Sequence, residues 1–525
     1  MPVPVILITD ALIFLLIAVG IVFGLYAARH EHLRGPWRQV GRSPVAVAAL
    51  VVMLFYVGIG VLDSLHFHPR IEPLAEVGSP AATVNEADAV TGPDGKTTPD
   101  EQGTDASGSQ RSAEQAQEIT QAKDTISAAE PGASAPTYST QIISVLDLLL
   151  SGLRERQEKT FSAPFATHLF VKEAIEQPDG SVVRAYPRLE HGGAHLEDPS
   201  QRSFDLLFRG LFGAIKGLMV WTAIMAGLIA LLGWRRRQSF NDTATALWRG
   251  ETAVPWRVVL ITLAIMLVLS FTAAELGAKY HILGTDKVGE DVFYQSLKSI
   301  RTGLVIGTLT TLVMLPAAIL LGIMAGYLGG RTDDVIQYLY TTLNSIPGVL
   351  LIAAAILMLQ VYMTNNADQF ESLVERADLR LLFLCIILGV TSWTGLCRLL
   401  RGESLKLREV DYVQAARALG VRHSTVIARH ILPNVLHIVM ITVVLDFSGL
   451  VLAEAVLSYV NIGVDPTMNS WGNMINSARL ELARDPIVWW SLAAAFLFMF
   501  TLVLAANLLA DVVRDAFDPR LRSAS

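Results

Sequence analysis

Long apolar runs separated by short polar stretches dominate the chain. A helix that crosses a membrane needs about 20 mostly apolar residues, and about nine runs approach or exceed that length. They lie near residues 4–27, 45–65, 210–234, 256–275, 300–328, 334–361, 381–400, 435–460 and 487–510. The pattern therefore predicts an all-α polytopic membrane protein.

Composition agrees with this pattern. The chain is 52% hydrophobic and 17% charged, with a mean hydropathy of +0.45, which is too apolar for a soluble domain of this length. Its net charge of -7 averages over unlike regions and gives no indication of nucleic-acid binding. Cys385 and Cys397 both belong to an apolar run, so no disulfide framework is readable.

The first apolar run, roughly Val3 to Tyr26, lacks both a basic region before it and a small-residue cleavage site after it. We therefore expect a retained membrane helix and not a cleaved signal peptide.

Arginine and lysine gather in loops that an up-and-down topology places on one side of the membrane. These residues are Arg29, Arg34, Arg38 and Arg42, then Arg235, Arg236, Arg237 and Arg249, then Arg398, Arg401, Lys406 and Arg408, and finally Arg514, Arg520 and Arg522. Because positive loops face the cytoplasm, we expect the N-terminus outside and the C-terminus in the cytoplasm of a multi-pass inner membrane protein.

One long polar segment, near residues 67–205, falls on the opposite side. Its first half, 75–136, is rich in small and acidic residues and cannot bury enough apolar surface to become ordered. The second half, 138–205, has the pattern of a small folded cap. Apolar residues recur at helical spacing between Ile142 and Leu153, and two strand-like runs, Thr167–Ile175 and Ser181–Tyr186, flank a turn at Pro178-Asp179-Gly180.

A second polar stretch, residues 401–434, lies between two apolar runs on the predicted cytoplasmic side. Its alanines favour a helix, and Gly420 can end that helix in a left-handed conformation. Ser424 can cap a second helix, which Pro433 would end. A short alanine-rich helix beside the membrane is suited to a groove on a soluble partner, although an ordinary helical hairpin would show the same periodicity.

This stretch resembles the EAA loop of binding-protein-dependent ABC permeases, and most closely the dipeptide/oligopeptide/nickel permeases. Gln414-Ala415-Ala416 stands where Glu-Ala-Ala is usual, with Gly420 and Ile431-Leu432-Pro433 following at the family spacing. The resemblance assigns the ATPase-coupling loop to Tyr412, Gln414, Ala415, Ala416, Ala418, Gly420, Ile431, Leu432 and Pro433.

Four further stretches match the family in order and spacing. They are Leu283-Gly284-Thr285-Asp286 with Gly289 and Asp291, Ala325-Gly326-Tyr327-Leu328-Gly329-Gly330, Glu454–Tyr459 with Ser470-Trp471-Gly472, and Asp515–Arg522. Trp37–Phe67 is similar to the family's N-terminal helix, whereas residues 68–280 have no counterpart in it. Glu290 also departs from the pattern, because arginine is usual there.

The resemblance implies a type I permease core of about six helices. To this core the chain adds about three transmembrane helices and a small extracytoplasmic insert. The domains expected are the N-terminal helices 1–67, the insert 68–205, two extra helices within 206–280, and the permease core 281–525 with its coupling loop at 401–434.

The implied partners are a second homologous permease, two cytoplasmic ATP-binding subunits, an extracytoplasmic substrate-binding protein and membrane lipid. The implied function is half of a translocation pathway for di- or oligopeptides. No cofactor is expected.

Acidic residues inside an apolar run are costly and often functional. Asp446 and Glu454 are eight residues apart on one predicted helix, within about 80° of each other around its axis. Each is a candidate to line the pathway. Alternatively, Glu454 hydrogen-bonds inside the bundle and only orients helices.

No sequence motif indicates catalysis. The chain has no G-x-x-x-x-G-K-[ST] loop for ATP phosphates, so we expect hydrolysis on a separate subunit. Two histidines, His191 and His195, with His168 and Asp198 nearby have ligand types that suit zinc, but the Gly-Gly between them is more typical of a turn, and we expect no metal site. Two other functions fit parts of the pattern, an ion-coupled secondary transporter and a membrane-anchored interaction protein.

Overall fold

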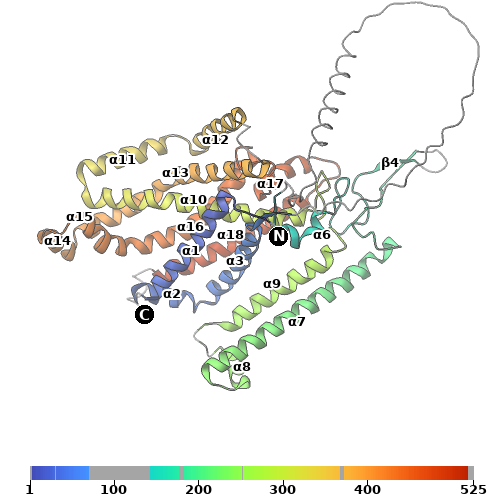
Figure 1. Ribbon diagram of the computed structural model, residues 1–525, viewed down its shortest axis with the longest axis horizontal. Coiled ribbons are helices and arrows are strands. Elements are labelled where there is room, and N and C mark those ends of the chain that lie inside the picture. The colour runs from blue at the N-terminus through green and yellow to red at the C-terminus, as the bar shows by residue number, and fades with distance from the viewer. Residues whose placement is uncertain are drawn as a thin grey trace, which may run out of the picture. The chain divides into compact units, whose positions relative to one another are not determined.

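The computed structural model describes residues 3–29, 31–69, 142–176, 182–250, 252, 254–366 and 372–517 (Figure 1). The chain divides into two units, one of residues 1–3 and 68–141 and one of residues 4–67 and 142–525. The predictions for 75–136, for the turn at 178–180 and for the end of the Asp515–Arg522 motif fall outside the described residues.

Eight helices within the described residues are long and apolar enough to span a membrane. They are α3 (Pro44–Asp63), α7 (Arg202–Arg236), α9 (Trp256–Gly277), α10 (Val292–Leu328), α12 (Gly348–Asn365), α13 (Leu373–Arg408), α16 (Leu432–Tyr459) with the turns that lead into it, and α18 (Trp490–Phe517). The first apolar run forms α1 (Ile8–Arg29), whose apolar part Ile8–Val22 is shorter. The all-α polytopic prediction is confirmed.

Short elements connect these helices. They are α2 (Glu31–Val40), α5 (Val145–Leu149), α6 (Ser151–Arg154), the 3-10 turn η1 (Pro199–Gln201), α8 (Phe240–Arg249), α11 (Gly330–Ser345), α14 (Asp411–Ala418), α15 (His423–Val426), the π-helical turn η3 (Ile427–Ile431) and α17 (Trp471–Glu481). Strands β1 (Val3–Val5), β2 (His66–His68) and β3 (Ile143–Ser144) form one small sheet in that order. Strands β4 (Glu173–Glu176) and β5 (Val182–Ala185) form an antiparallel pair, as predicted for the insert.

The prediction of one helix over 334–361 is wrong, because α11 ends at Ser345 and α12 begins at Gly348. Ile346 adopts an extended conformation, with φ -92° and ψ 129°. Proline at position 347 forces this break, since its ring disfavours helical geometry in the preceding residue and it has no N–H to donate. The composition also changes at this point, because α11 consists mostly of polar residues and α12 mostly of apolar ones.

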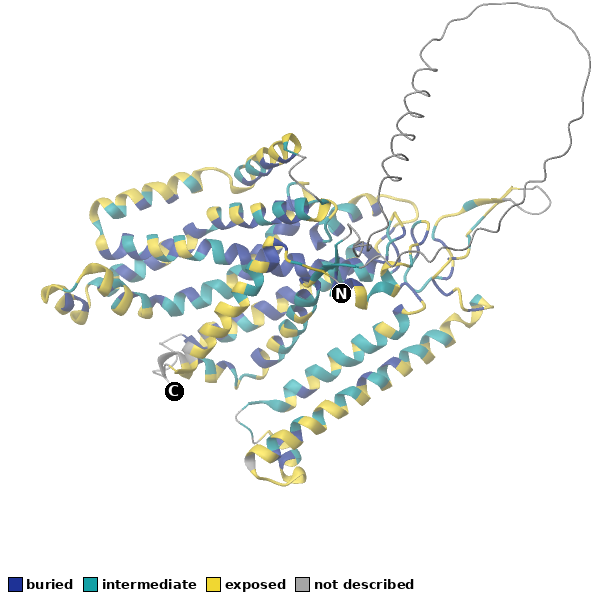
Figure 2. Cartoon of the chain, in the orientation of Figure 1, coloured by how far each residue is buried: buried dark blue, intermediate teal, exposed yellow. Residues whose placement is uncertain are grey.

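Burial is concentrated in α10, α13, α16 and α18, with α3 packed beside α10 and α18 (Figure 2). Glycines bring α10 and α13 together. A Cβ added at Gly322 would lie 2.8 Å from the carbonyl oxygen of Cys397, and one at Gly326 would lie 2.4 Å from that of Arg401. This small-x-x-x-small spacing permits the close backbone approach that holds helices together in lipid.

Helices α7 and α9 form a separate pair, which reaches the rest of the bundle mainly through contacts between α9 and α3. The same glycine spacing joins the pair, because a Cβ at Gly213 or Gly217 would lie within 2.8 Å of the α9 backbone at Thr272 or Val268. Lys216 of α7 also pairs with Glu275 of α9. Few other residues of the pair are buried, as expected for helices that face lipid.

The connections place α2, α8 and α14 at one end of the helices and α17 at the other; we name these the α14 end and the α17 end. Helix α1 begins beside the start of α10, and α3 ends there. Helix α2, which connects α1 to α3, therefore lies at the opposite end of the helices. The segment after α9 is bound to the start of α10, so α8 lies at the far end as well. Helix α10 itself runs from the α17 end to the α14 end.

Candidate coupling site and buried charge clusters

The stretch predicted to couple forms two helical segments with a bend at Gly420. Helix α14 has Asp411 in its first turn, and Gly420 follows its end with φ +76°. This left-handed conformation favours glycine and explains why the chain can turn there. The predicted bend is confirmed.

Two details of that prediction are wrong. Arg422 and not Ser424 occupies the cap of α15, without a side-chain hydrogen bond, and Pro433 does not end the helix. The chain passes from α15 through the π-helical turn η3 into α16, with Pro433 in the first turn of α16. Local π geometry can accommodate the missing N–H of proline, so the helix continues to Tyr459.

The predicted coupling residues divide into two groups. Those that face outward are Tyr412, Gln414, Ala415, Ala418, Gly420 and Pro433, whereas Ala416 and Ile431 are buried against the chain itself and Leu432 is half-buried. Sequence reasoning missed Leu419, which is 84% exposed beside the bend. Its exposure beside the bend leaves this side chain available to a docked partner.

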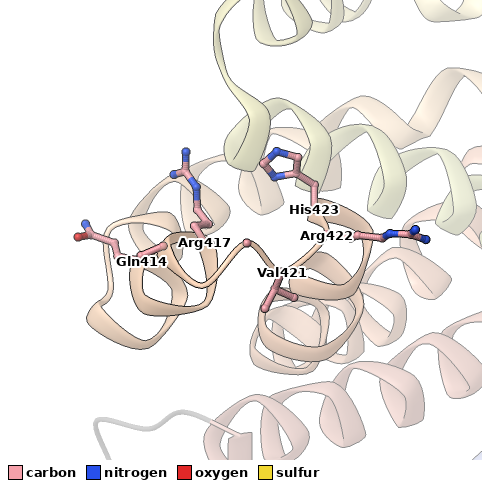
Figure 3. Close-up of a pocket in the computed structure, with 7 residues that line it drawn as sticks. Gln414, Arg417, Val421, Arg422 and His423 are labelled. Atoms are coloured by element: carbon pink, nitrogen blue, oxygen red, sulfur yellow. The ribbon is translucent and has the colours of Figure 1, made fainter.

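Beside the bend lies an open groove of about 690 Å³ (Figure 3). It is lined by Gln414, Arg417, Ala418, Gly420, Val421, Arg422 and His423. The groove therefore offers two guanidinium groups and small side chains, which suits a partner surface with acidic residues at its rim.

The AGYLGG stretch packs against the same bend. The hydroxyl of Tyr327, at the end of α10, lies 2.9 Å from Nδ1 of His423, and Arg417 lies over the Tyr327 ring at 5.9 Å. Arg401 of α13 donates two hydrogen bonds to Asp333 of α11, of 2.6 and 2.7 Å. The first contacts bind α10 to the bend, and the second pair binds α13 to α11, so the AGYLGG stretch and the coupling stretch form one structural unit.

The GTD stretch binds the insert to the start of α10. The Thr285 hydroxyl donates to the carbonyl oxygen of Thr160 and accepts a hydrogen bond from N–H of Ser162. Gly289, with φ +80°, lies so close to the backbone of Glu158 that a Cβ would overlap it. The insert therefore fits onto the family motif and is not a loosely attached addition.

Glu290, the departure from the family pattern, has a partner in this arrangement. The Gln295 amide donates to both Glu290 and Asp286, each at 2.9 Å. A neutral donor thus bridges two carboxylates at the start of α10.

A buried histidine joins the insert to α10. Nδ1 of His281 lies 2.7 Å from Asp291, and its Nε2 lies 3.4 Å from Glu158. Burial alone would lower the pKa of His281, but the hydrogen bonds and charges of Asp291 and Glu158 outweigh burial and raise the pKa to about 9. Burial would likewise raise the pKa of Glu158, yet His281 and three backbone N–H groups lower it to about 2.

Those N–H groups belong to Glu190, His191 and Gly192, in the segment that we weighed as a metal site. The segment forms a turn around a carboxylate, and His195 pairs with Asp205 at 2.8 Å. Within the described residues no group of three or more potential ligands could hold a metal ion.

The histidine cluster predicts a pH-dependent stability. An unfolded histidine loses its proton near pH 6.5, whereas His281 keeps it to about pH 9. Its stabilisation is therefore complete below pH 6.5 and is lost as the pH rises through 9. We expect the melting temperature of the purified protein to fall between pH 6.5 and 9.5, and to fall less in His281→Gln. His191→Gln, an exposed control, should keep the wild-type dependence of melting temperature on pH. The same dependence in His281→Gln would contradict the assignment of this effect to His281.

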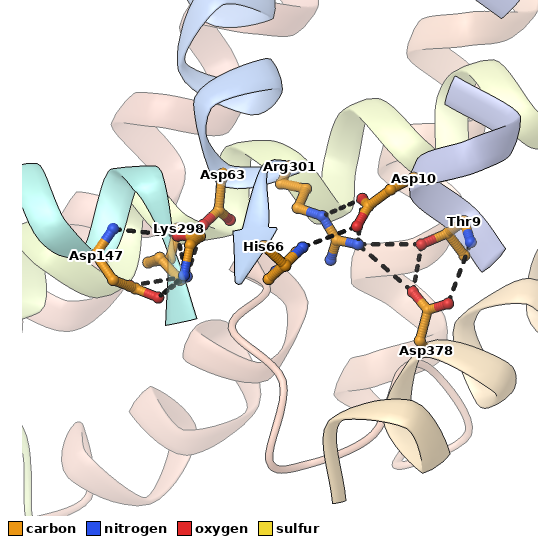
Figure 4. A network of polar contacts seen from close by, with 9 residues as sticks. Thr9, Asp10, Asp63, His66, Asp147, Lys298, Arg301 and Asp378 are labelled. Carbon is orange, nitrogen blue, oxygen red and sulfur yellow. Dashed lines mark hydrogen bonds and ion pairs between the residues drawn. The ribbon is translucent and has the colours of Figure 1, made fainter. Parts of the chain in front are cut away.

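A second charge cluster lies at the α17 end around Lys298 and Arg301 of α10 (Figure 4). Arg301 donates to Asp10 of α1 at 2.7 Å and lies 3.5 Å from Asp378 of α13. Both carboxylates are buried, and Asp10 also lies 2.8 Å from Nδ1 of His66. The cluster joins the N-terminal helix to two helices of the bundle.

Lys298, three residues earlier on α10, holds the insert. Its ammonium group lies 2.6 Å from Asp63 at the end of α3 and 2.9 Å from Asp147 of α5. Ser144 donates to Asp63, and Tyr294 donates to Asp147. Sequence reasoning singled out none of these residues, although Asp10 within an apolar run was the available signal.

The two candidate pathway residues both lie on α16, as predicted. Glu454 is buried and accepts a hydrogen bond of 2.7 Å from Ser458, and a Cβ at Gly472 would lie 2.8 Å from its Oε1. Glu454 therefore hydrogen-bonds within α16 and lies beside Gly472 of α17, and a role in orienting helices, the alternative to a pathway role, stays a prediction as well. Asp446 is half-buried, and a pathway role for either residue stays a prediction.

Comparison with known proteins places this geometry in a family. The model of the family described as binding-protein-dependent transport system inner membrane component matches residues 318–523, which include the coupling stretch. The chain is 32% identical over 245 residues to the glutathione transport system permease protein GsiD of Pectobacterium atrosepticum, a match that covers 46% of this chain and 74% of that protein. The chain belongs to this family.

Two further relatives extend the comparison. The oligopeptide transport system permease protein OppC of Haemophilus influenzae is 27% identical over 301 residues, which cover 54% of this chain and 90% of the relative. The dipeptide transport system permease protein DppC of Bacillus subtilis is 28% identical over 242 residues, 46% of this chain and 69% of the relative. The protein is therefore an ABC importer permease and a multi-pass inner membrane protein.

Proposed function

We propose that this permease imports peptides and that the α14–α15 groove docks a cytoplasmic ATPase subunit. The observation that carries the proposal is the groove itself, which is exposed and basic and whose segments contact α10, α13 and α16. The chain would form half of a translocation pathway beside a second, homologous permease. Two ATPase subunits would drive the pair, and an extracytoplasmic binding protein would deliver the peptide.

Coupling would proceed through the helices that meet at the groove. Closure of the ATPase pair would push on α14, and α13 and α16 would carry the displacement toward the α17 end, because both are continuous over most of their length. The Tyr327–His423 contact would pass the same movement to α10.

The proposed orientation rests on charge. Arg34 and Arg38 on α2, Arg249 on α8 and Arg417 on α14 all belong to segments at the α14 end. Positive loops face the cytoplasm, so the α14 end would be cytoplasmic and the N-terminus would lie outside.

The substrate class is inferred from the relatives, whose names refer to oligopeptides, dipeptides and glutathione. All three are peptides or peptide-like compounds. In this proposal the binding protein chooses among them.

Uptake by whole cells tests the proposal against ion coupling. In cells that carry the partner genes but no other peptide importer, we expect labelled di- or oligopeptide to enter only when the gene of this permease is also present. Uptake should continue when a protonophore collapses the proton gradient and glycolysis maintains ATP. Uptake that stops with the gradient while ATP remains high would instead support the ion-coupled alternative.

A further inference from the structure

The segment that joins α7 to α9 exposes aromatic and basic side chains together. We name residues 234–250 and 254–257 the α8 turn. Trp234 is 81% exposed, Trp248 59% and Phe240 49%. Arg235, Arg237, Arg249 and Arg257 are exposed as well, and none forms an ion pair with another described side chain.

The α8 turn lies where the α7–α9 pair leaves the membrane. The apolar part of α7, residues 210–233, is roughly 36 Å long at 1.5 Å per residue, enough to cross the hydrocarbon core. Trp234 follows directly, so the turn begins at the level of the lipid headgroups. Tryptophan is enriched at that level because its ring is amphipathic.

Helix α8 is held against the end of the pair and does not extend into the solvent. Arg237, with φ +54°, ends α7, and α8 contacts both α7 and α9. Its buried face consists of Thr243 and Leu247, and Thr243 packs against Gly233 of α7. Figure 1 shows α8 folded back across the end of the pair, so its other faces are available for contacts.

The charge of this segment is strongly one-sided. Between residues 234 and 257 the sequence has five arginines and two acidic residues, a net charge of 5 - 2 = +3, in a chain whose net charge is -7. Guanidinium groups bind phosphate oxygens in a fixed fork, and polybasic segments beside apolar helices are attracted to anionic leaflets.

We propose that the α8 turn binds the headgroups of anionic phospholipids in the leaflet that it faces. The arginines contact the phosphates, and Phe240 and the two tryptophans lie among the headgroups and upper acyl chains. Lipid is the occupant that these observations favour, because the two helices that lead into the turn are long and apolar enough to span a membrane and bury few of their residues against the rest of the chain. The binding anchors an element that the matched family region, residues 318–523, does not contain.

Lipid selectivity of the full-length protein tests this proposal. The protein is placed in phosphatidylcholine bilayers with a trace of spin-labelled phosphatidylglycerol or spin-labelled phosphatidylcholine, and the fraction of motionally restricted label is measured. We expect the wild type to prefer the anionic label by at least about fivefold at low salt, and the preference to fall toward one at high salt.

The matched variants locate the effect. Arg235→Gln/Arg237→Gln/Arg249→Gln should lose most of the preference, whereas Arg29→Gln/Arg34→Gln/Arg38→Gln, which removes three exposed arginines at the same end of the helices, should keep it. An equal loss in both variants would mean that bulk charge attracts the lipid, and no loss in either would mean that the arginines do not bind it. Either result overturns the proposal. All six positions are exposed, so both variants should fold.

Discussion

Leu419→Asp should abolish association with the ATPase subunits and peptide uptake together, while the protein remains in the membrane at its normal level. Leu419 is 84% exposed beside the Gly420 bend and makes little contribution to the packing of its own chain. A carboxylate at the centre of a docked surface would be desolvated without a partner, which costs several kcal/mol and reduces a micromolar contact by about a thousandfold or more. Co-purification of the complex and uptake of labelled peptide are the two measurements.

The matched control is Leu480→Asp. Leu480 is 70% exposed on α17, at the other end of the helices, and the same substitution there should leave ATPase association intact. Retention of the ATPase by Leu419→Asp would exclude the bend from the docking surface, whatever its effect on uptake.

The structure also changes which alanine tests docking. Ala416 belongs to the predicted coupling loop, but its side chain faces the interior with Val413 and Val426. A bulky charge at Ala416 would disturb the packing of the loop itself, so a loss of function there would not separate docking from folding. Substitutions at Ala415 and Ala418, which face outward, act on the surface directly.

Local signals were sufficient to predict most of the spans and the coupling bend. Each apolar run is long compared with the uncertainty of its ends. Gly420 can adopt the left-handed conformation that ends a helix without any contact to distant residues, so the bend follows from the local sequence. The break before Pro347 was also readable in principle, since proline restricts the residue before it. The prediction extended the apolar run of α12 across this proline into α11, whose residues are mostly polar.

Long-range pairing explains what the sequence could not reveal. Asp10 and Arg301 are almost 300 positions apart, and neither has a local partner in the sequence that signals the contact. Glu158 binds three backbone N–H groups more than 30 positions away, an arrangement that no side-chain pattern encodes. The insert looked separate in sequence because its composition differs from that of the core. In the structure, Glu158 of the insert and the GTD stretch occupy one packed site.

Loss of the Arg301 side chain should be the most destabilising single change at the α17 end. Arg301→Met would leave Asp10 and Asp378 buried without their cation, and breaking a buried ion pair from one side costs roughly 3–5 kcal/mol. We expect a large fall in the melting temperature of the detergent-purified protein. Arg237→Gln, an exposed control, should change stability by less than about 0.5 kcal/mol.

The triple variant Asp10→Asn/Arg301→Met/Asp378→Asn distinguishes charge from shape. It removes the arginine and both of its carboxylate partners, so neither carboxylate is left buried without its cation, and replacing buried charges together by neutral groups is often close to neutral. The triple variant should therefore recover most of the stability lost in Arg301→Met. If it is instead no more stable than Arg301→Met, the guanidinium acts by filling space between α1, α10 and α13, and the N-terminal helix is held by packing and not by charge.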